Sequence, residues 1–197
     1  MLEAWDVYFR NVDNVKIVGG DFFSVKADAV VSPANSFGFM DGGLDLHISN
    51  KLGWHLQGRL QKIIRDEYYG ELLVGQAVSV ATDNIDFPYV ISAPTMRVPM
   101  ILGRETVNPY LACKAALITG LQTSDVETIT FSGLGTSVGR VPFKVAAYQM
   151  FLAYKEIVLS DYVDPKTWAS AQAQHQSMYS KETFDMQKPK FKFKWKT

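Results

Sequence analysis

The chain has 197 residues, 47% of them apolar, so it can bury one good hydrophobic core, and we expect one main domain. Its 20 Lys and Arg residues balance 20 Asp and Glu residues, so no overall charge drives it toward nucleic acid or a membrane. A single cysteine, Cys113, excludes an internal disulfide and a cysteine-based metal cluster. Because the sequence shows neither a signal-peptide pattern nor an apolar run long enough to span a bilayer, we expect a cytoplasmic protein without a membrane partner.

The first half of the chain alternates short apolar runs with longer amphipathic segments. Strands are predicted at Val15–Val18 and Ala29–Ser32, and helices at Leu44–Leu52 and Trp54–Tyr69. The longer helix carries one apolar face, formed by Leu56, Leu60, Ile63 and Ile64.

The second half continues the alternation. Strands are predicted at Ala77–Ala81, Tyr89–Ala93 and Thr128–Ser132, and helices at Asn108–Leu121 and Pro142–Val158. The strands are short and bounded by Gly, Pro and Asp, which is typical of buried strands in a mixed or parallel sheet. The pattern predicts a layered α/β domain over residues 1–159.

Residues 160–197 form a C-terminal extension of different composition, richer in Ser, Gln, Lys and Asp. Its last ten residues, Lys188–Thr197, alternate lysine with aromatic residues, which is the period of a strand. One interpretation is an edge strand that packs its aromatics on the domain, or a solvated tail. The other is a basic and aromatic segment that contacts nucleic acid or an acidic surface. The first is favoured because no other basic cluster provides a groove.

Two glycine-bearing turns follow predicted strands. The first runs from Asn35 through Gly42 and Gly43 to Asp45 at the start of a helix, and the second is Gly133–Arg140. Such turns predict two backbone cradles for a phosphorylated ligand, because glycine lets N–H groups approach phosphate oxygens closely. Asp45 would place a candidate general base beside the first cradle.

Each of these residues also has a purely structural interpretation. A single glycine turn is an ordinary tight connection, and Asp21 can be a helix cap or turn residue. Asn35 can form an Asx-turn that ends the strand, and Asp45 can be an acid in the first turn of its helix. Two glycine turns combined with an ordered set of motifs favour the ligand-binding interpretation.

The motifs together resemble those of macrodomains, the ADP-ribose-binding modules. They are, in order, Gly20-Asp21, Pro33-Ala34-Asn35, Gly42-Gly43-Leu44-Asp45, Gly75-Gln76-Ala77 and Gly133–Gly139. The resemblance spans roughly Val15 to Lys155. It implies a three-layer α/β/α sandwich with a mixed, largely parallel sheet, a ligand that is ADP-ribose or an ADP-ribosylated macromolecule, and no cofactor.

The resemblance also implies roles for individual residues. Asp21 matches the acid that accepts a hydrogen bond from the adenine amino group, and Phe22 matches the neighbour that frames the adenine. Asn35 matches an asparagine at the distal ribose, and Asp45 matches an aspartate that helps activate water there in hydrolytic members. The two phosphate loops match Gly42, Gly43 and Leu44 on one side, and Gly133, Gly135, Thr136, Ser137, Val138, Gly139 and Arg140 on the other.

Departures from the family pattern leave catalysis open. Ser32 replaces the first asparagine of the family motif, Met40 and Asp41 replace two glycines, and Ser137 replaces a glycine of the second loop. Ser92 takes the place of a histidine often found in the middle strand. The alternatives are a pure binder, an ADP-ribosyl hydrolase or ADP-ribose-1''-phosphate phosphatase that uses Asp45 and Asn35, and a non-catalytic assembly or interaction protein that retains the fold. We expect no metal site, because the histidines lack metal-ligand spacing.

Overall fold

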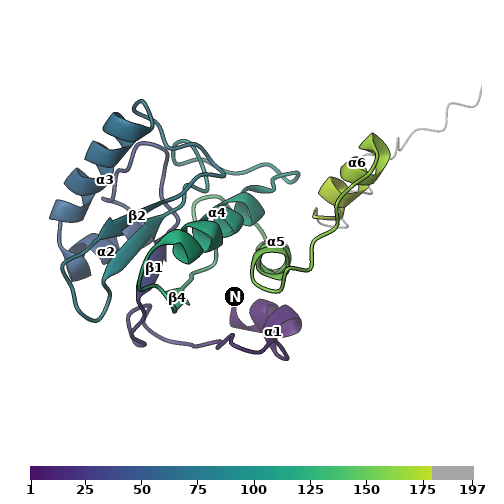
Figure 1. Cartoon of the computed structure of the whole chain (residues 1–197), viewed down its shortest axis with the longest axis horizontal. Coiled ribbons are helices and arrows are strands. Elements are labelled where there is room, and N and C mark those ends of the chain that lie inside the picture. The colour runs from purple at the N-terminus through teal and green to yellow at the C-terminus, as the bar shows by residue number, and fades with distance from the viewer. Residues whose placement is uncertain (179–197) are drawn as a thin grey trace, which may run out of the picture.

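The computed structural model describes residues 1–178, and the Lys/aromatic segment 188–197 lies outside these residues. Figure 1 shows a central sheet with helices on both sides. The elements are, in chain order, α1 (Leu2–Phe9), β1 (Ala29–Ser32), α2 (Gly43–Leu52), α3 (His55–Glu67), β2 (Val78–Ala81), β3 (Tyr89–Ser92), α4 (Asn108–Gln122), β4 (Ile129–Thr130), α5 (Phe143–Ile157) and α6 (Trp168–Ser177).

The sheet has four strands in the order β2-β3-β1-β4. Strand β1 runs parallel to both of its neighbours, β3 and β4, whereas β2 is antiparallel to β3. The predicted mixed, largely parallel α/β sheet is therefore confirmed. Because β1 and β3 are parallel and in register from Ala29↔Tyr89 to Ser32↔Ser92, the two strands end at the same level.

Two hydrophobic cores cover the two faces of the sheet. The first, here called the α4/α5 core, contains Phe9, Val31, Ile91, Ala116, Leu134 and Met150. The second, here called the α2/α3 core, contains Val30, Ile48, Leu60, Val80 and Val90. Alternate residues of β1 enter opposite cores, and all four are fully buried, which explains why the strand reads as an unbroken small and apolar run.

Most predicted elements are confirmed to within a few residues, with two exceptions. Val15–Val18 is not a strand, and β4 is only two residues long. A strand needs a partner backbone, and among the described residues β4 pairs with β1 alone, while Val15–Val18 forms no ladder with another segment.

The first and last helices were not predicted. Helix α1 is short, and its position depends on tertiary packing: Phe9 makes edge-on contacts with the rings of Phe151 and Tyr154, at 5.4 and 5.9 Å between centroids. Helix α6 has no buried residue, and it begins at a capping box formed by Thr167 and Ser170.

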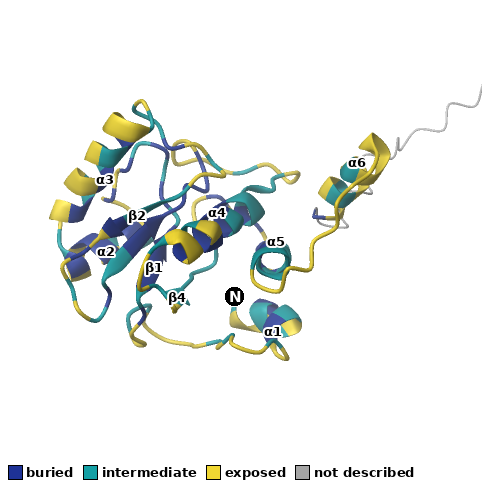
Figure 2. Ribbon diagram, in the orientation of Figure 1, coloured by how far each residue is buried: buried dark blue, intermediate teal, exposed yellow. Residues whose placement is uncertain are grey.

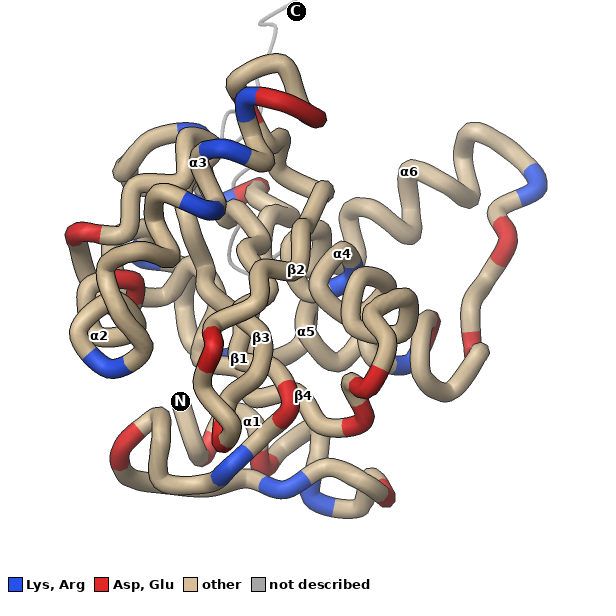
Figure 3. The backbone as a smooth tube through the Cα atoms, turned by 60° about the vertical axis from the view of Figure 1, so that its left-hand side comes forward, with Lys and Arg blue, Asp and Glu red and all other residues tan. Residues whose placement is uncertain are grey.

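The surface is described by the exposure of α6 and by the distribution of charged residues. Figure 2 shows α6 as largely exposed or half-buried, in contrast to the buried strands. Lys and Arg are interspersed with Asp and Glu along the chain in Figure 3. Within residues 1–178, no helix combines the length and the apolar character that crossing a membrane requires.

The α2/α3 core yields a stability prediction. Leu60 is 1% exposed, so Leu60→Ala should lower the free energy of unfolding by about 2–5 kcal/mol through lost burial and a residual cavity. Leu73→Ala is the matched control, because this side chain is 54% exposed and its loss should change stability by about 0.5 kcal/mol or less. Urea denaturation of both variants checks this, and equal effects would contradict the assigned core.

Candidate functional site

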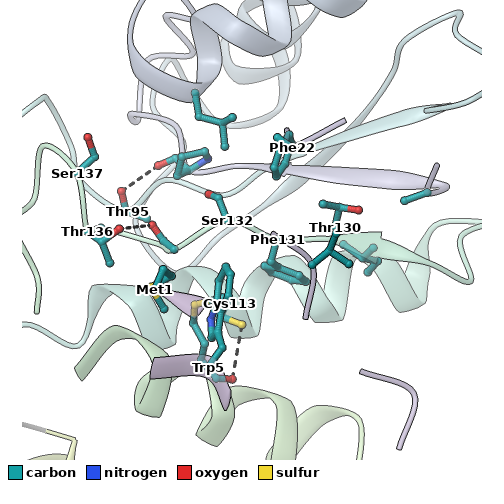
Figure 4. Close-up of a pocket in the computed structure, with 18 of the residues that line it drawn as sticks. Met1, Trp5, Phe22, Thr95, Cys113, Thr130, Phe131, Ser132, Thr136 and Ser137 are labelled. Carbon is teal, nitrogen blue, oxygen red and sulfur yellow. Dashed lines mark hydrogen bonds between the residues drawn. The ribbon is translucent and has the colours of Figure 1, made fainter. Parts of the chain in front are cut away.

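One cavity of about 1410 Å³ opens where the chain leaves β1, β3 and β4 (Figure 4). Ligands in open α/β sheets bind outside the carboxyl ends of the strands, so its position is typical of a binding site. Nearly all of the candidate site residues line it: Asp21, Phe22, Asn35, Gly42, Gly43, Leu44, Asp45, Gly133, Gly135, Thr136, Ser137, Val138 and Gly139. Arg140, which is exposed, is not among the lining residues.

The side chain of Asn35 shapes the loop after β1. Its Oδ1 accepts hydrogen bonds from the backbone N–H groups of Phe37 (3.1 Å) and Phe39 (3.3 Å). Its Nδ2 donates to the carbonyl oxygen of Phe39, at 2.7 Å. Asn35 therefore forms the Asx-type turn that the structural interpretation of the sequence expected. The residue also lines the cavity.

The N-terminus of α2 forms part of the cavity wall. Gly42 is the N-cap in an extended conformation, and Gly43 follows with φ of +56°. A Cβ placed on either glycine would meet no atom within 4 Å, so the backbone here borders open space. The first N–H groups of a helix lack intrahelical partners and carry partial positive charge, which makes this end suited to an anion.

Asp45 lies in the first turn of α2 and is 8% exposed. The Ser32 hydroxyl, at the end of β1, donates a hydrogen bond to Asp45 Oδ1 at 2.5 Å. Burial raises the pKa of Asp45 to about 6; the Ser32 hydrogen bond opposes this shift, and the nearby charge of Asp41 adds to it. The side chain is thus a buried carboxyl group that titrates close to neutral pH.

The second glycine turn, Gly133–Gly139, forms the opposite wall. Gly135 has φ of +68°, and a Cβ on Gly139 would lie 2.5 Å from the Gly135 carbonyl oxygen, so the loop closes too tightly for a side chain there. The Thr136 hydroxyl donates to the Gly133 carbonyl at 2.8 Å. The N–H of Leu102 donates to the Gly139 carbonyl at 2.9 Å, which ties the turn to the loop after β3.

Asp21 and Phe22 lie at another end of the cavity. Asp21 is exposed, and its Oδ1 lies 3.1 Å from His47 Nε2 and accepts from the N–H of Phe23. The hydrogen bond with His47 is the main cause that lowers the pKa of Asp21, followed by the one from Phe23. Phe22 packs edge-on against Phe23, with 5.3 Å between ring centroids.

Three residues that contribute to the site were not predicted from the sequence. Ser32 was noted only as a departure from a motif, yet it holds Asp45. Thr95 lines the cavity, and its hydroxyl donates to the Pro33 carbonyl at 2.9 Å. His47, a half-exposed residue of α2, contacts Asp21. Position directly after a strand was the available signal for Thr95, since the strand ends meet at one edge.

Two further observations concern charged and metal-binding groups. Arg97 follows β3 but forms a surface ion pair with Glu71, with its Nε at 2.6 Å from Glu71 Oε1. Among residues 1–178, no group of three or more His, Cys, Asp or Glu side chains is placed to hold a metal ion.

Comparison with known proteins gives a consistent result. The profile of the Macro domain matches residues 31–150. An uncharacterized protein of Aquifex aeolicus is 32% identical over 140 residues, which cover 70% of this chain and 78% of that protein. Among solved structures, the Oceanobacillus iheyensis macrodomain with ADP has a TM-score of 0.62 at 17% identity, covering 81% of this chain and 88% of that one.

A second structural neighbour is the DarTG protein of Thermosipho africanus in complex with ADP-ribose. Its TM-score is 0.57 at 12% identity, and the match covers 73% of this chain and 38% of that protein. At such identities the solved structures establish the fold alone, whereas the family profile covers more than half of the chain. The chain therefore belongs to the Macro domain family.

Proposed function

We propose that this cavity binds ADP-ribose, free or attached to a macromolecule, with its diphosphate between the two glycine loops. The observation that carries the proposal is the convergence of Gly42–Asp45 and Gly133–Gly139 on one cavity from points about ninety residues apart in the chain. Both loops border it with glycine backbone, which suits an elongated diphosphate. The structurally similar Oceanobacillus iheyensis macrodomain binds ADP, and DarTG of Thermosipho africanus is in complex with ADP-ribose.

The two ends of the cavity differ in a way that orients this ligand. Phe22 and Asp21 offer an aromatic surface and an exposed carboxylate at one end, which fits adenine and its amino group. Asn35, Asp45 and Thr95 gather polar side chains at the other end, which fits the distal ribose.

Hydrolysis at the distal ribose is the second candidate function, and the environment of Asp45 favours it. A general base is most effective when its pKa lies near the working pH. The pKa of about 6 and the fixed contact with Ser32 give Asp45 this property and a defined orientation. In this mechanism Asp45 accepts a proton from water that attacks the anomeric carbon, and the bond from that carbon to the attached group breaks. The leaving group takes up a proton, from Asp45 or from solvent, while the loops hold the diphosphate in place.

A role in assembly without ADP-ribose remains the alternative from a different class. Under this alternative, the glycine loops serve only as connections between elements. The protein would then show no affinity for ADP-ribose that a side chain at the cavity entrance could reduce. The first experiment below separates it from the proposed function.

The binding prediction uses Gly42→Val. In the wild-type protein, ADP-ribose at a hundredfold excess over its dissociation constant should add about 2.7 kcal/mol to the free energy of unfolding. Gly42 has a backbone that any residue adopts and free space for a side chain, so valine should leave the fold intact and block the phosphate path. We expect affinity, measured by calorimetry, to fall at least about tenfold, a loss of ~1.4 kcal/mol.

The matched control is Gly103→Val. Gly103 is also exposed and has open space around it, but it does not line the cavity. The affinity of the Gly103→Val variant for ADP-ribose should equal that of the wild-type protein. The absence of any thermal shift or calorimetric signal with wild-type protein and millimolar ADP-ribose would refute the proposed function.

The protonation of Asp45 gives a pH-dependent stability prediction. Because its folded-state pKa of about 6 exceeds the unfolded value, the group contributes stability below about pH 4 that is lost as the pH rises through 6. At pH 8 the buried carboxylate should therefore cost up to roughly 3 kcal/mol. Asp45→Asn should make the protein more stable than the wild type at pH 8, and this advantage should vanish near pH 4. Urea titrations at both pH values measure it, with Asp125→Asn, at an exposed carboxylate outside the cavity lining, as control.

The hydrolase candidate makes a separate kinetic prediction. Asp45→Asn should reduce turnover of an ADP-ribosylated substrate by roughly 10²–10⁴-fold, because the general base is lost, while ADP-ribose affinity stays within a few-fold. Turnover is measured as release of ADP-ribose from a mono-ADP-ribosylated substrate. Wild-type turnover that survives the substitution would show that Asp45 is not the base.

A further inference from the structure

Ser92, the last residue of β3, has a buried hydroxyl group without a partner. The residue is 0% exposed, and its Oγ makes no hydrogen bond to any of the described residues. Buried polar groups in folded proteins are nearly always hydrogen-bonded, because an unpaired group loses its bonds to water and gains nothing in return. An unpaired hydroxyl at the end of a central strand therefore indicates an interaction that the site uses.

The side chain of Ser92 lies on the face of the sheet that α2 covers. Val30 and Val90 both belong to the α2/α3 core, and side chains two positions apart along a strand point to the same face. Ser32 and Ser92, which follow these valines by two positions, therefore share this face. The hydrogen bond from Ser32 to Asp45 of α2 places Ser32 there independently.

Ser32 and Ser92 are also direct neighbours across the sheet. Strands β1 and β3 pair in parallel, and their register places Ser32 opposite Ser92. Neighbouring strands lie about 4.8 Å apart. A serine side chain on one strand reaches the serine beside it when χ1 adopts the staggered rotamer that points across this gap.

The two hydroxyl groups complement each other as donor and acceptor. Ser32 donates its single hydrogen to Asp45 Oδ1 at 2.5 Å, and the Ser32 oxygen keeps lone pairs that can accept. Ser92 has a hydroxyl hydrogen without an acceptor among the described residues. A hydrogen bond from Ser92 to Ser32 would satisfy the buried group, and it would polarise the Ser32 hydroxyl toward the carboxylate, since hydrogen bonds in a chain strengthen one another.

The charged groups around Asp45 do not stabilise its carboxylate. Strands β1 and β3 carry no charged residue, Tyr89 of β3 packs against the α4/α5 core, and the nearby charge of Asp41 is negative. Every other ionisable residue of α2, and of α3 that packs against it, is exposed: His47, Lys51, His55, Arg59, Lys62, Arg65, Asp66 and Glu67. Hydroxyl groups at the strand ends are therefore well placed to support the charged form of Asp45.

We propose that Ser92 is a positioning residue of this site: its hydroxyl donates to Ser32 Oγ and so commits the Ser32 hydrogen to Asp45. The chain of hydroxyl groups occupies Oδ1 of Asp45 and leaves Oδ2 for a water molecule. Its consequence for hydrolysis rests on the proposed role of Asp45 as general base, whereas the chain itself forms without ADP-ribose.

Titration of Asp45 in the ligand-free protein, followed by ¹³C NMR of its carboxyl carbon, tests the proposal. Hydrogen bonds to a charged group are stronger than those between neutral groups, so the chain favours the carboxylate over the acid. Ser92→Ala should therefore raise the pKa of Asp45 by at least about half a pH unit. An unchanged pKa of Asp45 in this variant would overturn the proposal.

The matched control is Ser79→Ala. The Ser79 oxygen is also buried and without a hydrogen-bond partner within residues 1–178. Ser79 lies on the opposite face of the sheet, because Val78 and Val80 beside it pack in the α2/α3 core. Its replacement should leave the pKa of Asp45 unchanged, and equal effects of the two variants would show that Ser92 has no specific link to Asp45.

The same titration in a Ser32→Ala background tests the route of the interaction. Ser32→Ala alone should raise the pKa of Asp45 more than Ser92→Ala does, because it removes the direct hydrogen bond. Adding Ser92→Ala to Ser32→Ala should then change this pKa by ~0.2 or less, since the connecting hydroxyl is gone. A full additional rise would mean that Ser92 acts without Ser32, which would overturn the proposed chain.

Thermal unfolding of the ligand-free variants gives a second readout. At pH 8, where Asp45 is ionised, Ser92→Ala should lower Tm by roughly 2–5 °C, and near pH 4, where Asp45 is protonated, by less. Ser79→Ala should leave Tm unchanged or raise it at both pH values, because it removes only an unpaired buried group. If Ser92→Ala behaved in the same way, its hydroxyl would be unpaired and the proposal wrong. Since no ligand is present, these results are independent of whether the cavity binds ADP-ribose, which calorimetry on the wild-type protein decides separately.

Discussion

The complete burial of strand β1 is the constraint on which the candidate site depends. All four of its residues are fully buried, and it pairs in parallel on both sides, so the chain must leave it at the same edge where it leaves β3 and β4. This edge holds Ser32, the loop of Asn35 and the start of α2 on one side, and the turn from Gly133 to Gly139 on the other. Parallel pairing therefore brings together two glycine loops that are far apart in the sequence, and no local feature of either loop could do so.

Within this edge, Asp45 shows a conflict between stability and chemistry. A carboxyl group that is almost fully buried loses hydration. Its pKa rises because the charged form is disfavoured. The N-terminus of α2 and the Ser32 hydroxyl reduce this cost without removing it. Strained or unfavourable groups of this kind are concentrated at functional sites, where the property that costs stability is the one the chemistry uses. Asp21 is exposed and its pKa is lowered, so its charged form carries no comparable cost of burial.

The cavity extends from the two glycine loops along the sheet to residues 15–18 and 126–132, so the loops and this edge of the sheet are structurally linked. Segment 15–18 leads directly into Gly20 and Asp21, and residues 129–131 lead directly into Gly133. The distance between these two segments therefore also affects the separation between Asp21 and the turn from Gly133 to Gly139.

The sequence by itself determined the α/β class, nearly all helices and strands of the central domain, and the two glycine loops with Asp21, Asn35 and Asp45. These features follow from local periodicity and from the short-range chemistry of glycine, which one segment displays alone. Only the tertiary structure decided that Val15–Val18 has no strand partner within residues 1–178 and that α1 packs through Phe9. It also decided that Ser32 contacts Asp45 and that His47 contacts Asp21. It also decided that Arg140 points outside the lining while Thr95 belongs to it. Each of these outcomes depends on which distant segments come into contact and on how far burial shifts the pKa of a side chain. The order of residues along one segment does not encode either of these.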